Sequence, residues 1–114
     1  NWTGAFSVMC GGTNILRDVT LERVNVAFTE LDLIRIRYAE DGGYYGTSIE
    51  DFTFRDIRFT PKGGQIAGVY LQGLDKKHTV KGVTFENVYV GNEKITSKSS
   101  LFHKNSYVSK LSFK

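Results

Sequence analysis

The sequence is poor in residues that interrupt or cross-link a chain. Its 114 residues include one proline, Pro61, and one cysteine, Cys10. A single cysteine excludes an internal disulfide, and its apolar neighbours predict a buried small hydrophobic residue rather than a reactive thiol. The chain also lacks any run of about eighteen apolar residues, so no membrane-spanning helix and no membrane partner are predicted.

Acidic residues are scarce in the C-terminal third. From Lys76 to Lys114 there are eight lysines and only two acids, whereas Asn1 to Thr60 contains six Lys or Arg and nine Asp or Glu. The net charge is only +3, and lysines in this pattern more often form a solvated face than a polyanion site. We therefore predict no nucleic-acid partner.

Four related segments dominate what is present. In "VKGVTFENVYV" (Val80–Val90) the first, fourth, sixth, ninth and eleventh residues are apolar. The same rhythm occurs in "LRDVTLERVNV" (Leu16–Val26), in "IEDFTFRDIRF" (Ile49–Phe59) and, truncated, in "VSKLSFK" (Val108–Lys114). The copies start 33, 31 and 28 residues apart, a period typical of repeat architectures. We number the places of each copy from first to eleventh, so that Leu16, Ile49, Val80 and Val108 occupy the first place.

Each copy alternates as a β-strand does, with an irregular step. Val83 and Phe85 are two residues apart, as are Val88 and Val90, which is the strand period. The step from Phe85 to Val88 breaks the alternation and predicts a bend. The copies are rich in β-branched and aromatic residues, which disfavours a helix. Further strand-like segments lie between the copies, including the strictly alternating "LIRIRY" (Leu33–Tyr38).

Stacking of these cycles predicts an all-β parallel β-helix, a solenoid in which each coil covers the edge of its neighbour. In-register stacking places equivalent residues about 4.8 Å apart, so opposite charges at equivalent places are favoured. The seventh place alternates in sign through Glu22, Arg55, Glu86 and Lys114. The sixth place is expected to form one inward stack of Leu21, Phe54, Phe85 and Phe113. The alternative is a β-sandwich with coincidentally similar strands, but sandwich strands follow one another at about 8–12 residues.

The copies Ile49–Phe59 and Val80–Val90 resemble the coil repeats of the pectin-lyase-like superfamily, enzymes that act on polysaccharides. "RIR" (Arg35–Arg37), "DGGYYG" (Asp41–Gly46) and then "IEDFTFRDI" are similar to the Arg-Ile-Lys strand, Gly-Gly loop and coil repeat of the polygalacturonase family of glycoside hydrolases. The segment 88–113 is similar to the tail of the dextranase family.

The resemblance implies a right-handed parallel β-helix of about three to four coils. Residues 1–114 would form one domain fragment, the C-terminal coils of a longer bacterial protein that is secreted or periplasmic. The catalytic aspartates of polygalacturonases have no counterpart here, because no Asn-Thr-Asp or Asp-Asp motif occurs. Phe6 stands where that family has the histidine of a Gly-His strand. The catalytic residues are therefore expected upstream, and the fragment alone is predicted to be inactive.

Strand alternation also predicts which side chains leave the core. With Ile34, Ile36 and Tyr38 inward, Arg35 and Arg37 point outward together. A guanidinium binds a carboxylate through two parallel hydrogen bonds, and an acidic sugar carries such a group. The alternative is that both arginines pair with acids on the protein surface.

A binding face is expected to extend over the neighbouring coils. One exposed row should contain Met9, Arg37, Tyr70 or Gln72, and His103. The complete set of predicted substrate-binding residues is Arg35, Arg37, Asp41, Tyr45, Tyr70, Gln72 and His103. His78 and His103 stand apart from other ligand-type residues, so no metal or cofactor is predicted.

These observations together predict part of a polysaccharide-degrading glycoside hydrolase that supplies a substrate-binding face and the final coils. Its partner would be a polysaccharide or oligosaccharide, preferably an acidic one. Two alternatives stay open: a non-catalytic structural β-helix, such as an adhesin or tail-fibre segment, and a polysaccharide lyase with Arg35 or Arg37 as its base. The first coil exposes an open edge, so self-association through Ala5–Gly12 is also expected.

Overall fold

The protein, seen in a computed structural model, consists of β-strands and connecting turns. The structure describes residues 4–11, 15–28, 32–39, 46–61 and 68–114. Among them no helix occurs, and thus none long and apolar enough to cross a membrane. The strands are β1 (Gly4–Cys10), β2 (Ile15–Phe28), β3 (Asp32–Tyr38), β4 (Ser48–Pro61), β5 (Val69–Leu71), β6 (Val80–Val90), β7 (Glu93–Lys94), β8 (Phe102–Lys104), β9 (Val108–Ser109) and β10 (Ser112–Phe113).

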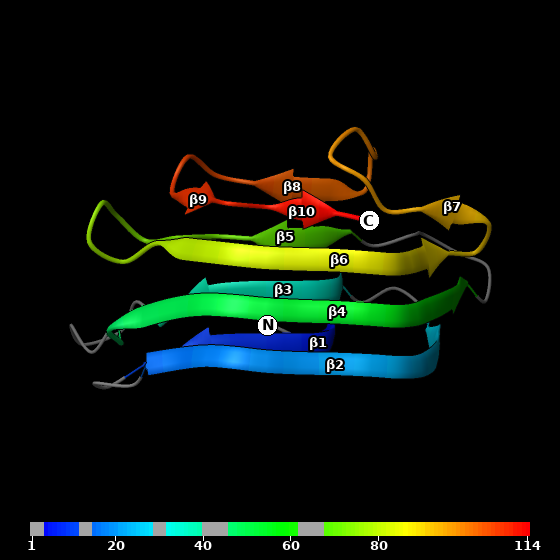
Figure 1. Ribbon diagram of the computed structural model, residues 1–114, viewed down its shortest axis with the longest axis horizontal. Coiled ribbons are helices and arrows are strands. Elements are labelled where there is room, and N and C mark those ends of the chain that lie inside the picture. The colour runs from blue at the N-terminus through cyan, green and yellow to red at the C-terminus, as the bar shows by residue number, and fades with distance from the viewer. Residues whose placement is uncertain (1–3, 12–14, 29–31, 40–45, 62–67) are drawn as a thin grey trace.

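Two parallel sheets face each other across the core (Figure 1). The short sheet has the strand order β1-β3-β5-β8, and the long sheet contains β2, β4, β6 and β10 in sequence order. Successive strands from β1 to β6 alternate between the two sheets, and Figure 1 shows the strands of one sheet running opposite to those of the other. The chain therefore winds in stacked coils, and the prediction of an all-β, parallel, solenoid-like architecture is confirmed.

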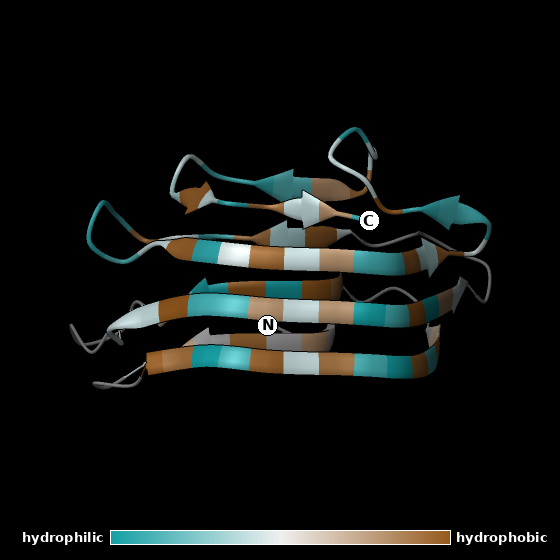
Figure 2. Cartoon of the chain, in the orientation of Figure 1, coloured by the Kyte–Doolittle hydropathy of each residue, from teal (hydrophilic) through white to brown (hydrophobic). Residues whose placement is uncertain are grey.

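The sequence copies stack in register over their whole length. Leu16 pairs with Ile49 and Ile49 with Val80, so the first places of three copies lie side by side. The fourth copy follows through β9, where Val108 pairs with Val80. Figure 2 shows the result as aligned columns of apolar and polar residues across β2, β4 and β6.

Bends with positive φ explain the irregular steps of the repeat. The eighth place has φ between 54° and 58° at Arg23, Asp56 and Asn87. The third place has φ between 55° and 57° at Asp18, Asp51 and Lys110, and 81° at Gly82. The pairing of β2 with β4 skips these residues, running from Arg17↔Glu50 directly to Val19↔Phe52. Each bend thus adds one residue to the outer side, after which the strand resumes with its apolar residue inward. The sequence predicted the eighth-place bend but not the one at the third place.

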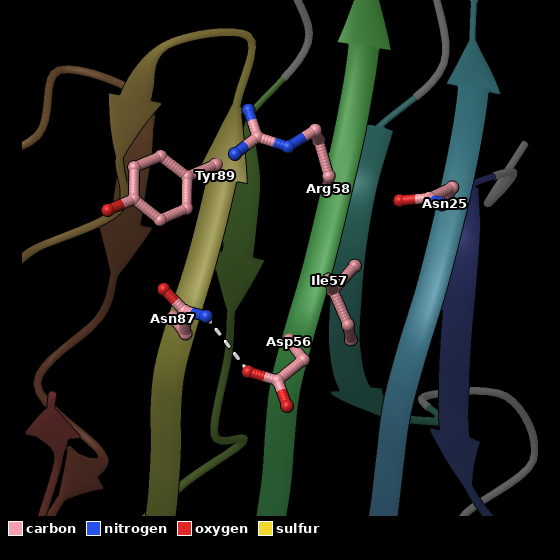
Figure 3. Close-up of a pocket in the computed structure, with 6 residues that line it drawn as sticks. All are labelled: Asn25, Asp56, Ile57, Arg58, Asn87 and Tyr89. Atoms are coloured by element: carbon pink, nitrogen blue, oxygen red, sulfur yellow. Dashed lines mark hydrogen bonds between the residues drawn. The ribbon is translucent and has the colours of Figure 1, made fainter.

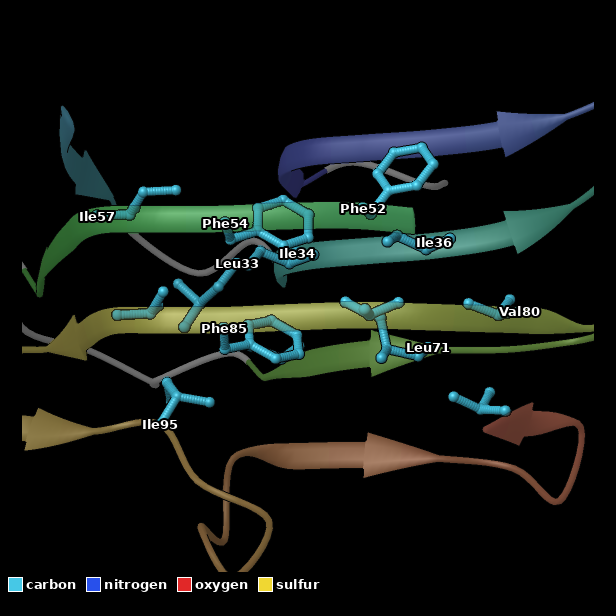
Figure 4. Packing of buried hydrophobic residues seen from close by; sticks show 14 of the residues in the cluster. Leu33, Ile34, Ile36, Phe52, Phe54, Ile57, Leu71, Val80, Phe85 and Ile95 are labelled. Carbon is cyan, nitrogen blue, oxygen red and sulfur yellow. The ribbon is translucent and has the colours of Figure 1, made fainter. Parts of the chain in front are cut away.

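Between the two sheets, side chains from equivalent places of successive coils stack on one another. The rings of Phe54 and Phe85 stack with centroids 5.5 Å apart, and those of Phe85 and Phe113 with centroids 5.3 Å apart. Leu21 pairs with Phe54, so the predicted inward stack is confirmed. Figure 4 shows the rings of Phe54 and Phe85 on the side of the long sheet that faces the short sheet. Cys10 is fully buried, as predicted.

The end of the solenoid beyond β6 departs from the repeat. After β6 the chain turns back, and β7 pairs antiparallel with it through Tyr89↔Lys94 and Val90↔Glu93. Ile95, 1 % exposed, donates its backbone N–H to the Val88 carbonyl at 2.9 Å and packs into the core. A hairpin therefore covers the last three residues of β6, which the truncated fourth copy does not reach.

Outside the core, the seventh-place charges of the first three copies meet as predicted. Arg55 lies between two acids, with Nη1 at 3.1 Å from Glu22 and Nε at 3.4 Å from Glu86. These bonds raise the pKa of the Arg55 guanidinium above its ordinary value, with the hydrogen bond to Glu22 the largest cause.

Candidate functional site

Those predicted binding residues that the structure describes lie on or beside the strands of the short sheet. Ile34 and Ile36 are fully buried, and the intervening Arg35 is part-exposed on the opposite side of β3. In β5 Tyr70 leaves the core between buried Val69 and Leu71. Arg37, Gln72 and His103 also reach the surface. The predicted orientation of these side chains is therefore confirmed.

The predicted row of Met9, Arg37, Tyr70 or Gln72, and His103 is correct in part. Met9 pairs with Arg37 as expected, but His103 belongs to a different row. Arg35 pairs with Tyr70, and Tyr70 pairs with His103, so these three residues form one row. Arg37 lies two residues further along β3, beyond the level of His103. The backbone N–H of Gln72 bonds to the Ile36 carbonyl, which places Gln72 near the level of Arg37. We call Arg35, Tyr70 and His103 the stacked row.

Planar groups of the stacked row lie on top of one another along the solenoid axis. The Arg35 guanidinium carbon is 5.0 Å from the centre of the Tyr70 ring. On the other side, the rings of Tyr70 and His103 stack with centroids 4.8 Å apart and an interplanar angle of 12°. Both faces of the Tyr70 ring are thus occupied, and the row presents polar edges outward. Such an edge can form hydrogen bonds, whereas a stacked sugar would need a free ring face.

A hollow of about 120 Å³ opens beside this row. Its lining residues are Tyr70, Leu71, Gln72, His103, Lys104 and Asn105. Asn105 fixes its wall by bonding to Gly73, two residues after β5. Its Nδ2 donates to the Gly73 carbonyl at 2.8 Å and its Oδ1 accepts from the Gly73 N–H at 3.1 Å. The hollow therefore offers a phenol, an amide, an imidazole and a lysine within one small area.

Two residues that support this face were not predicted from the sequence. Asn105 lies in "SLFHKNS", where nothing distinguishes it from an ordinary turn residue. A Cβ at Gly68 would lie 2.8 Å from the Leu101 carbonyl oxygen and 3.0 Å from His103 Cδ2. Only a glycine at this position lets β8 approach closely enough for His103 to stack on Tyr70. The predicted residues Asp41 and Tyr45 lie outside the described part of the chain.

His78 serves a turn in the described structure. Its Nδ1 lies 2.8 Å from Asp75 Oδ1, which also accepts the backbone N–H groups of Lys77 and His78. The bond from His78 is the largest cause that lowers the pKa of the Asp75 carboxyl. No group of three or more potential metal ligands occurs among the described residues.

A second hollow, of about 150 Å³, lies on the long sheet (Figure 3). Its lining residues are Asn25, Asp56, Ile57, Arg58, Asn87 and Tyr89. Asn87 Nδ2 donates to Asp56 Oδ1 at 2.9 Å, and the Arg58 guanidinium carbon lies 4.9 Å from the centre of the Tyr89 ring. Arg58 also donates to the Gly91 carbonyl. These polar groups stabilise the eighth-place bends and the turn into β7, so we regard the short sheet as the stronger candidate.

Comparisons with known proteins leave the family open. The chain matches no protein-family model, no curated protein and no solved structure.

Proposed function

We propose that the outer face of the short sheet binds an oligosaccharide, preferably an acidic one. The observation that carries this proposal is the stacked row of Arg35, Tyr70 and His103 beside the hollow that contains Gln72. A flat surface of a rigid sheet with aligned hydrogen-bonding edges suits an extended chain rich in hydroxyl groups. The ligand would lie across the coils and contact one residue of each.

Hydrogen bonding, rather than ring stacking, would dominate recognition in this geometry. The Arg35 guanidinium can donate N–H groups and the Tyr70 ring can donate its O–H group. The packing of these two side chains against each other already orders them. Preorganised side chains lose less conformational entropy when they bind. The free face of the His103 ring, on the last strand of the short sheet as described, is the remaining place where a sugar ring would stack.

The preference for an acidic ligand rests on charge. Arg35, Arg37 and Lys104 place three cations on or beside the stacked row. A hydrogen bond between an arginine and a carboxylate contributes about 1.5–3 kcal/mol. A uronic acid would therefore bind more tightly than its neutral analogue.

In the wider protein, we propose that these coils belong to a right-handed β-helix of a secreted or periplasmic glycoside hydrolase, whose catalytic carboxylates lie elsewhere. The resemblance of Ile49–Phe59 and Val80–Val90 to pectin-lyase-like coils supports this, and the parallel stacking of these copies is consistent with it.

The test is calorimetric titration with matched neutral and uronic-acid oligosaccharides. The acidic ligand should bind roughly tenfold or more tightly, as expected for one arginine–carboxylate bond, and should lose affinity as salt is added. Arg35→Ala should remove this advantage. Arg58→Ala is the matched control, because it removes an equivalent arginine–tyrosine contact from the other sheet.

Other results would redirect the proposal. Equal affinity for both ligands would refute the acidic preference and favour a neutral glucan. Failure to bind any oligosaccharide would refute the binding face and favour the structural β-helix. Loss of affinity in Arg58→Ala but not in Arg35→Ala would move the site to the long sheet.

A further inference from the structure

The outer edge of β2 is the uncovered end of the long sheet. β2 is the terminal strand of that sheet, and no described strand pairs with its other side. Its ninth-place residue, Val24, is only partly buried, whereas the equivalent Ile57 and Val88 are each 1 % exposed. Ile15, at the start of the strand, is 51 % exposed. Among the described strands, the columns of stacked apolar residues therefore reach β2 as a layer that is covered by a neighbouring coil on one side.

The two bends of β2 restrict what can cover this edge. Asp18 and Arg23 have φ of 57° and 55°, and in β4 the matching Asp51 and Asp56 have φ of 55° and 54°. Coils pair along their whole length because their bends coincide. A strand without bends at these two levels would pair with only a short piece of β2.

An antiparallel partner with the same two bends cannot match β2. In an antiparallel pair, directly opposed residues point to the same face. Four residues separate Asp18 from Arg23, so aligning the bends of two antiparallel copies would oppose inward Val19 to outward Glu22. A shift of one residue would restore the faces but would separate the bends. Two chains therefore cannot join β2 to β2 over their full length.

A parallel partner can align both bends and also keep inward residues beside inward residues. The charges of β2 then determine which residues the partner should carry. In register, its second residue would lie beside Arg17 and its seventh beside Glu22. Within the protein these neighbours are Glu50 and Arg55, both of opposite sign. The corresponding residues of β6, Lys81 and Glu86, would oppose like charges at both places.

We propose that the outer edge of β2 binds a parallel strand that carries the chain's own repeat, with an acid at the second place and a base at the seventh. Among the copies in this chain, β4 is the type that fits. The inference is independent of the proposed sugar binding. The end beyond β6 of a second copy is a poorer partner, because the short β9 and β10 and the antiparallel β7 stand there in place of a complete copy.

The experiment uses labelled peptides and the intact chain. One peptide has the sequence of residues 48–61, and a second carries the exchange Glu50→Arg with Arg55→Glu at the same composition. Fluorescence anisotropy gives the affinities, and hydrogen exchange identifies the strand that becomes protected. The native peptide should protect β2 amides and bind roughly tenfold more tightly than the exchanged peptide, with a difference that shrinks in high salt.

A third peptide, with Asp51→Val and Asp56→Val, removes the bends while keeping the inward residues. Valine disfavours positive φ, so this peptide should bind weakly. Equal binding of the native and exchanged peptides would overturn the charge rule. Protection at β8 or β10 instead of β2 would overturn the site. If the chain alone forms a dimer in which all β2 amides are protected from hydrogen exchange, the partner of β2 is a second copy and the proposed choice of partner is overturned.

Discussion

Asn87 and Asp56 occupy the same bend in adjacent coils and bond to each other there. Their φ angles are 58° and 54°, and Asn87 Nδ2 donates to Asp56 Oδ1 at 2.9 Å. Asparagine and aspartate tolerate the left-handed region because their short polar side chains bond locally. The eighth-place bend is thus held both by residue type and by a bond between neighbouring coils.

Replacing Asn87 tests this bend. Asn87→Val should destabilise the protein by about 1–2 kcal/mol through the conformation alone, because a β-branched residue is disfavoured at positive φ. Asn87→Gly is the control, since it keeps the conformation and removes only the side-chain bond. Chemical denaturation should rank the wild type and Asn87→Gly well above Asn87→Val, and equal stability of the two variants would contradict the role of the bend.

Core substitutions should reveal a gradient of stability along the solenoid. Phe54 is fully buried between Leu21 and Phe85, so Phe54→Ala should cost about 3–5 kcal/mol. Leu21 packs on one side only and is partly exposed, so Leu21→Ala should cost clearly less than the about 2–5 kcal/mol typical of a buried leucine. Urea denaturation measures both. A cost for Leu21→Ala as large as that for Phe54→Ala would indicate that the β2 end is already covered in solution.

The buried hydroxyl of Tyr38 should make stability fall at high pH. Tyr38 is 2 % exposed and donates to the Thr79 carbonyl at 2.6 Å, and burial is the largest cause that raises its pKa to about 12. An unfolded tyrosine ionises near pH 10, so the folded state retains its proton over a wider range. The free energy of unfolding should therefore be unaffected by Tyr38 below pH 10 and decrease between pH 10 and about 12.

Tyr38→Phe isolates this contribution from the lysines, which titrate in the same range. The variant should be less stable at neutral pH, because the Thr79 carbonyl loses its donor, but its stability should fall less steeply above pH 10. Cys10→Ala is a second control, because burial also raises the pKa of that thiol. Parallel pH profiles for wild type and Tyr38→Phe would show that the hydroxyl is not buried as described.

The charge ladder at Arg55 should be visible through its dependence on salt. Arg55→Glu would place three carboxylates in register at the seventh place, which should destabilise the protein at low ionic strength. The loss should shrink in about 1 M salt, where charges are screened within about 3 Å. Arg55→Gln is the control for the loss of the two ion pairs without the repulsion. A loss that is independent of salt would contradict the electrostatic explanation.

Gly46 should be intolerant of any side chain. Its φ is 86°, and an added Cβ would overlap Cys10 Sγ. Gly46→Ala should therefore destabilise the protein by more than the about 1–2 kcal/mol of the conformation alone. The double variant with Cys10→Ala should recover only the part that comes from the overlap with Sγ, because the contacts with the backbone carbon and Cβ of residue 10 remain. Thermal unfolding of the three variants checks this, and full recovery would mean that the backbone strain is negligible.

The fold was predictable because its pattern recurs. Phe54, Phe85 and Phe113 share a place in the repeat, so one copy supports the interpretation of the others. The second bend was missed because Gly82 alone resembles an ordinary turn glycine, while its equivalents Asp51 and Lys110 share no obvious chemistry with it. The antiparallel β7 has no counterpart in the other copies, so the repeat contained no information about it.

The candidate site was less predictable, because it depends on register between segments without a repeat. Alternation alone correctly turned Arg35 and Tyr70 outward. It could not decide whether His103 lies beside Arg35 or Arg37, since the connections between these strands differ in length. The stacking of Tyr70 between two planar groups is likewise a property of packing, and it favours hydrogen bonding over ring stacking as the chemistry of this row.

The repeat divides its places into those that the coil needs and those that can change without affecting it. Inward places and bends constrain the coil, whereas the second, fifth, seventh and tenth places face solvent and can vary one rung at a time. A lineage could therefore exchange one binding surface for another while keeping every feature by which the coil is recognised. Relatives sharing this repeat need not share a ligand, and divergence should be fastest at these outward places.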